Sequence, residues 1–214
     1  MIISSYNVRG LGGAVKWNAI KDLVRQEKVE FLAIQETKMV TITDSFCYNI
    51  WGGEDCQWVY LPAVGNSGGI LSMWSKSSAS LIFSFAGDSF IGVCLDWGIN
   101  KKRVFIVNVY SKYDLNGKRI LWDNLVMSKL GFGGGAWCVL GDFNAILNSG
   151  ERKGVNHLGS VSPSVELVEF NNFVTNMELV DLPILGRRFT WYHTNGISMS
   201  RIDRVLVSED WLVS

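Results

Sequence analysis

Short hydrophobic runs recur along the chain and predict a protein rich in β-strands. Each run is dominated by β-branched and aromatic residues and lies between segments with turn-forming residues. Eight runs predict strands over residues 2–8, 30–36, 69–74, 80–85, 90–97, 103–110, 137–143 and 200–207.

Three other stretches have the spacing of amphipathic helices, because their apolar residues fall on one helical face. Ser162 followed by Pro163 is a start signal for the last of these helices. The three apolar stripes are Trp17, Ile20 and Val24, then Trp122, Val126 and Leu130, and then Leu167, Phe170, Val174 and Met177.

Many strands with a few interspersed helices favour two sheets packed face to face with helices outside, rather than a strict alternation of strand and helix. The 214 residues are 48% hydrophobic and 19% charged, which suits one large core. We therefore expect an α/β protein with a single domain over residues 1–214.

Composition narrows the class of protein further. Lys plus Arg and Asp plus Glu balance at 20 each, so no strong global charge draws the protein to nucleic acid, although a local basic patch remains open. The four cysteines show neither a CxxC pair nor zinc spacing with histidine, which favours reduced thiols in the cytoplasm or nucleus. The sequence shows no signal peptide and no apolar run of membrane length, so we expect a protein that is neither secreted nor in a membrane. We also expect it to be a monomer.

Polar side chains interrupt five of the apolar runs near the ends of the predicted strands. Any one of them is explained by a cap or a turn, but five together favour a site. Carboxylates and amides with a tyrosine, and without Cys or His ligands, suit Mg²⁺ and the hydrolysis of a phosphate ester, although composition alone leaves Ca²⁺ open. The interruptions are Asn7, then Gln35 and Glu36, then Asn108 and Tyr110, then Asp142 and Asn144, and finally Asp203.

Five motifs in this order resemble the endonuclease/exonuclease/phosphatase superfamily, and most closely the endonuclease domain of plant LINE-type non-LTR retrotransposons. They are SYNVRGL at 5–11, AIQETK at 33–38, NVYS at 108–111, GDFNAIL at 141–147 and SRIDRVLVS at 200–208. The resemblance runs over nearly the whole chain. It implies a four-layered α/β sandwich of two mixed β-sheets and metal-dependent cleavage of phosphodiesters.

The resemblance also implies a role for each motif. Glu36 would be the main metal ligand with Asn7 beside it, and the metal would be Mg²⁺, with Mn²⁺ as a substitute. Asp142 would orient or deprotonate the attacking water, and Asn144 would hold the scissile phosphate. Tyr110 would contact a phosphate.

The family closes with a Ser-Asp-His motif on a last strand, and the 214 residues contain no such motif. Asp203 would be the acid that pairs with that histidine. His157 is expected in an exposed loop, and His193 at the surface or a strand edge. We expect the domain to lack its last strand, which would impair catalysis and leave residues 202–207 without a neighbouring strand.

The first hypothesis is a Mg²⁺-dependent DNA endonuclease domain that nicks target DNA for retrotransposition, with a reverse transcriptase downstream. A catalytically inactive remnant that keeps the fold is one alternative, and a phosphatase or phospholipid phosphodiesterase of the same fold is another. Six basic residues that flank the polar motifs are expected to contact DNA: Arg9, Lys38, Lys112, Arg187, Arg188 and Arg201. Thr190 resembles the family's threonine that precedes an aromatic residue near the DNA surface, so the resemblance implies a DNA contact there too.

Overall fold

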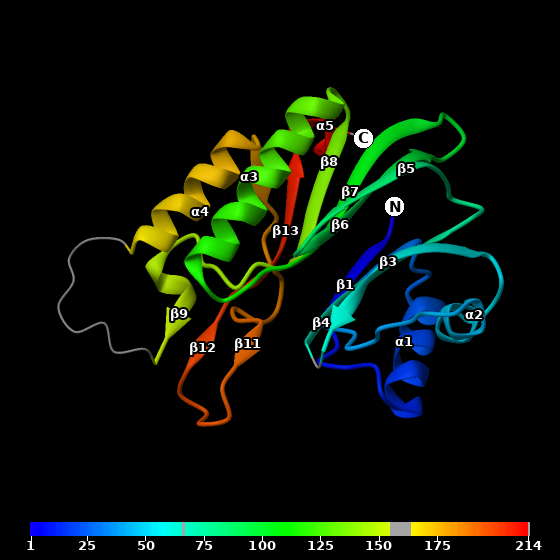
Figure 1. The fold of residues 1–214 in the computed structure, drawn as a ribbon, viewed down its shortest axis with the longest axis horizontal. Coiled ribbons are helices and arrows are strands. Elements are labelled where there is room, and N and C mark those ends of the chain that lie inside the picture. The colour runs from blue at the N-terminus through cyan, green and yellow to red at the C-terminus, as the bar shows by residue number, and fades with distance from the viewer. Residues whose placement is uncertain (66, 155–163, 214) are drawn as a thin grey trace. The chain divides into compact units, whose positions relative to one another are not determined.

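The structure is a computed structural model that describes residues 1–65, 67–154 and 164–213 (Figure 1). All eight predicted strands are present. Their bounds are β1 Ile3–Asn7, β2 Phe31–Gln35, β4 Ser67–Ser75, β5 Ala79–Gly87, β6 Phe90–Trp97, β7 Lys102–Tyr110, β8 Ala136–Asp142 and β13 Asp203–Ser208.

Five strands were not predicted from the hydrophobic pattern. The longest, β3 Cys56–Val64, contains Pro62 and has half-buried residues on both faces, so it shows no clean alternation. The other four have only two or three residues each and depend on their partners for pairing. They are β9 Arg152–Lys153, β10 Leu179–Asp181, β11 Trp191–Tyr192 and β12 Met199–Ser200.

The three predicted helices are present as α1 Ala14–Gln26, α3 Leu115–Phe132 and α4 Val165–Asn176. Ser164 caps α4 by accepting a hydrogen bond from the Leu167 amide, whereas the predicted start at 162–163 lies outside the described residues. Two short helices, α2 Asp44–Trp51 and α5 Glu209–Leu212, and the 3-10 turn η1 Ser149–Glu151 were not predicted.

The predicted stripe on α3 is wrong in part. Trp122 is buried as predicted, but Leu130 is 73% exposed. The buried face instead carries Lys118, Leu121, Trp122 and Leu125, which follow the i, i+3, i+4, i+7 spacing of one helical face. A lysine at the head of that face hid it from a search for apolar residues.

The strands form two large sheets and one small one. One sheet has the order β1-β2-β4-β3, in which β1 and β2 are parallel and the other pairs are antiparallel. The second has the order β10-β13-β8-β7-β6-β5, and the small sheet has the order β11-β12-β9. The predicted α/β sandwich of two mixed sheets with helices outside is confirmed.

This strand order corrects one expectation. We expected residues 202–207 to lack a neighbouring strand, but β13 lies between β10 and β8. Val180 pairs with Val207, and Asp181 pairs with Leu206. The short β10, which the hydrophobic pattern did not reveal, therefore covers this edge of β13.

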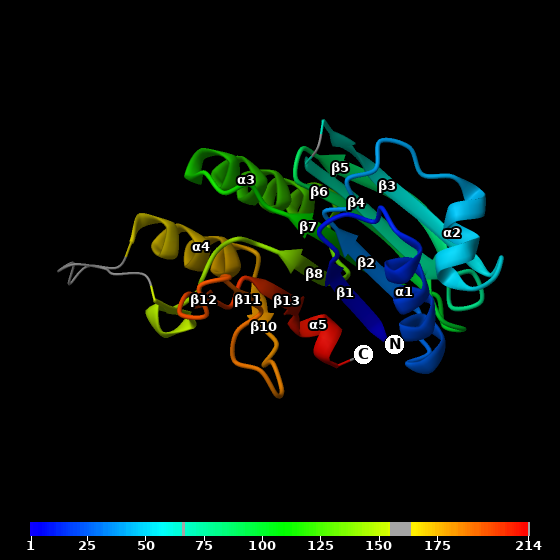
Figure 2. The ribbon, with the colours of Figure 1, turned by 90° about the horizontal axis from the view of Figure 1, so that it is seen from below.

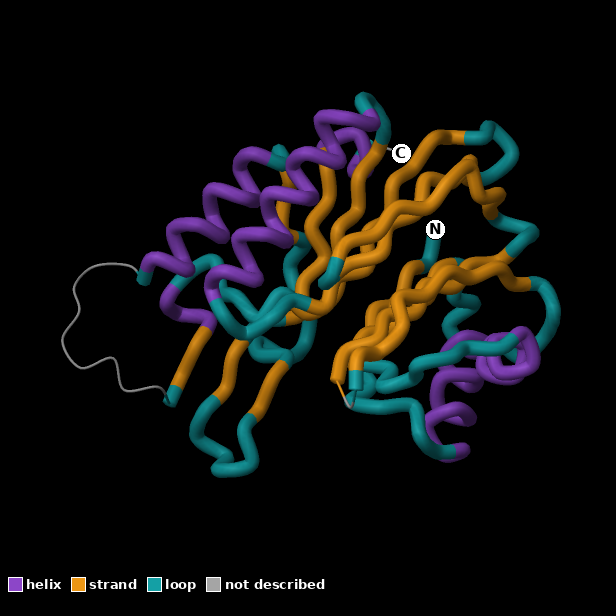
Figure 3. The backbone as a smooth tube through the Cα atoms, viewed as in Figure 1, coloured by secondary structure: helices purple, strands orange, loops and turns teal. Residues whose placement is uncertain are grey.

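The chain forms two compact units, the first of Met1–Tyr110 with Val139–Gly141 and the second of Ser111–Cys138 with Asp142–Ser214. In the first unit, α1 and α2 lie together on the outer face of the four-stranded sheet (Figure 2). Strands β2 and β4 contact β7 on the other face. In the second unit, α3 and α4 lie side by side (Figure 3) and stack Trp122 on Phe170 with ring centroids 5.5 Å apart.

Two further expectations concern cysteines and membranes. All four cysteines are buried free thiols, and burial raises the pKa of Cys47 to about 12, so this thiol stays protonated and unreactive. Among the described residues, no helix is both long and apolar enough to cross a membrane.

Candidate functional site

The ends of β1 and β2 bring Asn7 and Glu36 to one edge of the first unit. The two strands are parallel, and Asn7 pairs in register with Gln35. The pairing continues past the strands, because the Val8 amide donates to the Gln35 carbonyl at 3.1 Å and the Gly10 amide to the Glu36 carbonyl at 2.7 Å. Carboxyl ends of neighbouring parallel strands meet at the same edge, so the two side chains start from adjacent backbone positions.

Glu36, directly after β2, has an unusual backbone conformation. Its φ is +56°, and that of Lys38 is +57°, in the left-handed region that costs a residue other than glycine roughly 1–3 kcal/mol. The amides of Thr37 and Lys38 donate to the carbonyls of Gly69 and Gly68, both at 3.0 Å, and these hydrogen bonds hold the conformation. The residues around Glu36 are thus held rigidly in a strained shape, as is common at functional sites.

The donor set at this edge fits a hard divalent cation. The Lys38 ammonium lies 3.1 Å from Glu36 Oε1, so the carboxylate already attracts a positive charge there. Asn7 adds an amide oxygen, which accepts from the Arg9 amide at 3.2 Å. In the described part of the chain, no three His, Cys, Asp or Glu side chains cluster as metal ligands. Mg²⁺ needs only one or two carboxylates plus water and substrate oxygens, whereas a Zn²⁺ site would need more protein ligands.

Gln35 and Asn108 belong to a buried network rather than to a solvent-facing site. Both side chains are fully buried, and Gln35 Nε2 donates to Asn108 Oδ1 at 2.6 Å. Asn108 Nδ2 donates to the Leu71 carbonyl at 3.0 Å and to Ser72 Oγ at 3.2 Å. This network links β2, β4 and β7 across the space between the two sheets of the first unit.

Tyr110 ends β7 in the first unit, where it is half-buried and its amide donates to the Ser89 carbonyl at 2.9 Å.

Position 141 on β8 accepts only glycine. Gly141 has φ +130°, and a Cβ atom there would lie 2.1 Å from the Val109 carbonyl oxygen. The glycine of the GDFN motif therefore allows β8 to approach β7 closely just before Asp142.

Asp142 and Asn144 form a tight turn at the end of β8 in the second unit. Both are more than nine-tenths buried, and Asp142 Oδ1 accepts from the Asn144 amide at 2.9 Å. Asn144 has φ +49°, and its Nδ2 donates to the Ser111 carbonyl at 2.7 Å. The carbonyl of Asp142 accepts from the Ser111 amide at 2.8 Å. The two predicted residues therefore share one turn that side-chain hydrogen bonds hold to Ser111.

The start of β13 is fixed by Thr190. Its Oγ1 accepts from the amides of Ile202 and Asp203 at 3.1 and 3.0 Å. The Ile202 carbonyl in turn accepts from the Phe143 amide at 2.9 Å. Asp203 is thus held near the Asp142–Asn144 turn of the same unit, and the threonine hydroxyl orders the backbone that carries it.

The comparison with protein families assigns the chain to one family. The model of the Endonuclease/Exonuclease/phosphatase family matches residues 4–214. The chain belongs to this family. Members of the family are hydrolases that act on phosphodiester bonds, and its nucleases generally use divalent metal ions.

Solved structures of family members share the fold at low sequence identity. A 3'-5' exonuclease from Neisseria meningitidis is 20% identical, with a TM-score of 0.74 over 97% of this chain and 87% of that one. The endonuclease domain of TRAS1, a telomere-specific non-LTR retrotransposon, is 16% identical, with a TM-score of 0.69 over 98% and 85%. The catalytic domain of human Nocturnin is 13% identical, with a TM-score of 0.64 over 97% and 81%. Among curated proteins, no sequence matches.

His193 lies at the surface, as the sequence predicts. It is exposed in the turn between β11 and β12, and its Nδ1 accepts from the Asn195 amide at 3.1 Å. The centroid of its ring lies 5.7 Å from the ring centroid of Trp191. The imidazole is therefore used locally in its own hairpin, and His157 lies outside the described residues.

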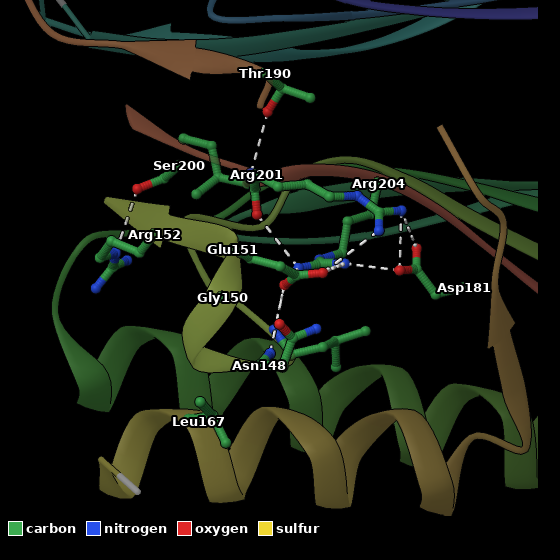
Figure 4. Close-up of polar contacts among 12 residues, drawn as sticks. Asn148, Gly150, Glu151, Arg152, Leu167, Asp181, Thr190, Ser200, Arg201 and Arg204 are labelled. Carbon is green, nitrogen blue, oxygen red and sulfur yellow. Dashed lines mark hydrogen bonds and ion pairs between the residues drawn. The ribbon is translucent and has the colours of Figure 1, made fainter. Parts of the chain in front are cut away.

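Four charged side chains form a buried ion network in the second unit (Figure 4). Only one of them, Arg201, was singled out in the sequence. Arg204 is 3% exposed and forms ion pairs with Glu151 and with Asp181, the latter at 2.7 Å. Arg201 pairs with the same two acids, at 3.4 Å to Glu151 and 2.9 Å to Asp181. Arg201 was predicted to contact DNA, but its charge is compensated inside the unit.

Glu151 is the centre of this network. Its Oε2 also accepts from the Leu147 amide at 2.8 Å, which ties the segment after the GDFN motif to β13. Burial raises the pKa of Glu151, but the hydrogen bond and charge of Arg204 outweigh it and hold the pKa below its usual range. Burial dominates at Asp181 and raises its pKa. The sequence did not single out Glu151, because one acid in an otherwise polar loop does not indicate a buried ion pair.

Replacing Glu151 with glutamine should lower the free energy of unfolding by about 3–5 kcal/mol, because Arg204 would keep a buried charge without its main partner. Urea unfolding at pH 7 measures the change. Glu178→Gln is the matched control, because Glu178 pairs with Lys129 at the surface and should change stability by less than about 1 kcal/mol. Equal effects of the two changes would contradict the network. Its stabilisation should be complete above the ordinary carboxyl pKa and be lost as pH falls through the lowered pKa of Glu151.

The remaining cations predicted to contact DNA lie at the surface. In the first unit, Arg9 and Lys38 line a pocket of about 590 Å³ together with Lys16. In the second unit, Lys112 and Arg187 are exposed.

Arg188 and Lys153 lie over the ring of Phe189, each 5.6 Å from its centroid. Arg188 also donates to the Gly150 carbonyl at 2.9 Å. Residues 182–202, which contain the β11–β12 hairpin, include no Asp or Glu. This part of the second unit is therefore positively charged and rich in aromatic rings.

Proposed function

We propose that this chain is a Mg²⁺-dependent DNA endonuclease domain of the non-LTR retrotransposon type. The observation that carries the proposal is the set of carboxylates and amides held at strand ends in left-handed or tightly turned backbones. Such residues persist in costly conformations where the surrounding structure over-determines them, and this is typical of catalytic sites. The five motifs between residues 5 and 208, which resemble LINE-type endonuclease domains, support the choice among activities of the family, and the TRAS1 endonuclease domain shares the fold.

In this proposal, Glu36 and Asn7 hold the metal ion at the ends of β1 and β2. The ion supplies positive charge to the phosphate oxygens when it is bound. Lys38, whose ammonium lies 3.1 Å from Glu36 Oε1, would place a positive charge beside this site for a DNA phosphate.

The proposed chemistry of the second unit uses Asp142 and Asn144. The buried Asp142 carboxylate accepts a proton from the attacking water or orients it, which is general base catalysis. The Asn144 amide, fixed by its left-handed backbone, donates a hydrogen bond to an oxygen of the scissile phosphate. Asp203 of the same unit would orient a histidine where one is present, and Tyr110 of the first unit would offer its phenol to a phosphate.

The test is a comparison of substrates with the purified chain in Mg²⁺ and in EDTA. We expect supercoiled plasmid to become nicked circle only in Mg²⁺, with 3'-hydroxyl ends that a DNA polymerase extends. A 3'-phosphorylated oligonucleotide and an inositol phosphate or phospholipid are the other arms. Cleavage of either without plasmid nicking would contradict the proposal and favour a phosphatase or a phospholipid phosphodiesterase.

Replacing Arg187 and Arg188 together with glutamine should weaken binding of a duplex oligonucleotide and reduce the magnitude of its salt slope by about 1–2, because each phosphate contact releases about one counterion. Fluorescence anisotropy over a salt series measures both quantities. Lys28→Gln with Lys101→Gln is the matched control, because it removes two exposed charges from turns in the first unit. An unchanged slope in the arginine variant would exclude these two side chains from the DNA contact.

A further inference from the structure

A buried lysine contacts the Asp142–Asn144 turn, and neither the family motifs nor the sequence pattern singled it out. Lys118 lies on α3 and its side chain is 2% exposed. Its Nζ donates to the Asn144 carbonyl at 2.7 Å and forms an ion pair with Glu166 Oε2 at 2.9 Å. The three residues come from α3, from the turn after β8 and from the first turn of α4.

An ammonium group at this place carries a cost that an apolar side chain would avoid. Its neighbours on the same helical face are Leu121, Trp122 and Leu125, so the position belongs to the core of the second unit. Burying a charge is unfavourable unless hydrogen bonds and a counter-charge compensate it. The compensation here comes from Glu166 and from the one carbonyl that belongs to Asn144.

That carbonyl is a sensitive point of the turn. Asn144 has φ +49°, and its carbonyl and its side chain share one Cα atom, so a movement of the peptide would disturb the hydrogen bond of Nδ2 to Ser111. Three hydrogen bonds fix the conformation of Asn144. Its backbone amide donates to Asp142 Oδ1, its Nδ2 donates to the Ser111 carbonyl, and its carbonyl accepts from Lys118 Nζ. Without the ammonium, the carbonyl would be a buried acceptor with no partner from α3, and rotation of the peptide would relieve this.

We infer that Lys118 is a positioning residue. It holds the Asn144 peptide group, so that the side-chain amide of Asn144 keeps the orientation in which it would donate to the scissile phosphate. The inference rests on the proposed role of Asn144. Lys118 does not touch the substrate in this account, and Glu166 compensates its charge. Removing the ammonium should therefore slow the chemical step through Asn144 and leave DNA affinity nearly unchanged.

The experiment compares Lys118→Met, which keeps the length of the side chain and removes its charge, with two controls. Glu166→Gln breaks the ion pair from the other side but leaves the hydrogen bond to Asn144. Leu121→Ala destabilises the same face of α3 without touching the turn. We expect Lys118→Met to lower kcat for plasmid nicking about 10–100-fold with KM within about threefold, below the loss of 10²–10³ for a removed phosphate donor. Both controls should keep kcat within about threefold at a temperature where all variants are folded.

A double variant separates positioning from general stability. In the Asn144→Ala background, adding Lys118→Met should lower kcat by less than about twofold, because groups that act as one unit are not additive. A full further loss in the double variant, or an equal loss in Glu166→Gln, would overturn the inference in favour of a purely structural ion pair.

One readout does not depend on turnover. In ¹⁵N spectra, the side-chain amide of Asn144 should shift in Lys118→Met and stay in place in Leu121→Ala and Glu166→Gln. If neither the 214-residue chain nor a version extended with a Ser-Asp-His strand nicks DNA, the proposed function fails, and the spectra still decide whether Lys118 positions Asn144. An unshifted Asn144 amide in Lys118→Met would overturn the inference whatever the activity.

Discussion

Replacing Glu36 with alanine should abolish Mg²⁺-dependent nicking, with a loss of at least about 10²–10³-fold in the initial rate. Glu36 is the one carboxylate at the ends of β1 and β2, so without it Asn7 alone would have to hold the cation. The alanine also leaves Lys38 without its 3.1 Å partner, which places an unopposed ammonium where the metal should bind. Initial nicking rates over a series of Mg²⁺ concentrations measure the effect.

The stability of the same variant provides the control. Glu36 and Lys38 form a partly exposed pair, and such pairs contribute about 0–1 kcal/mol, so the variant should unfold at nearly the same urea concentration as the wild type. Glu54→Ala removes an exposed carboxylate of the same unit and should leave the nicking rate unchanged. Normal nicking by a folded Glu36→Ala variant would rule out Glu36 as the metal ligand.

Adding a strand with a Ser-Asp-His motif after residue 214 should raise kcat for nicking by about 10²–10³-fold. The only histidines of the chain are His157 and His193, and His193 is engaged in its own hairpin. Asp203, which Thr190 holds at the start of β13, is the acid expected to orient the added histidine. The gain should come from charge stabilisation on the phosphate, so KM should change less than kcat.

The control for this gain is an extension in which alanine replaces the histidine. Asp203→Asn in the extended chain should remove most of the gain, while the same change in the 214-residue chain should have little effect on nicking. A gain that survives the loss of the histidine would mean that the added strand acts through stability. No gain at all would show that a Ser-Asp-His motif does not limit nicking by residues 1–214.

The sequence places the polar residues at strand ends because their signal is local. An acid or amide inside an apolar run stands out, and the structure places Asp142 and Asn144 in one turn after β8. Glu36 follows β2 directly, as the AIQETK motif indicates. What the sequence could not show is the backbone conformation at Glu36 and Asn144, which depends on hydrogen bonds from segments distant in sequence.

The missed features depend on tertiary contacts. Lys118 looks like a surface lysine until α3 is placed over the turn after β8. Glu151 and Arg204 are 53 residues apart, and only the fold brings their charges together. Arg201 was predicted to contact DNA from its place beside a motif, and its ion pairs with Glu151 and Asp181 are visible only in the fold. The short β10 is likewise visible only through its pairing with β13.

The most direct test of the central claim is nicking of supercoiled plasmid by the 214-residue chain and by its Ser-Asp-His extension, each in Mg²⁺ and in EDTA. We expect nicked circle from the extended chain in Mg²⁺ only, a slower reaction from the 214-residue chain, and none from either chain once Glu36 is alanine. Absence of nicking by the folded extended chain in Mg²⁺ would contradict this expectation, and would leave the fold of the family without its nuclease activity.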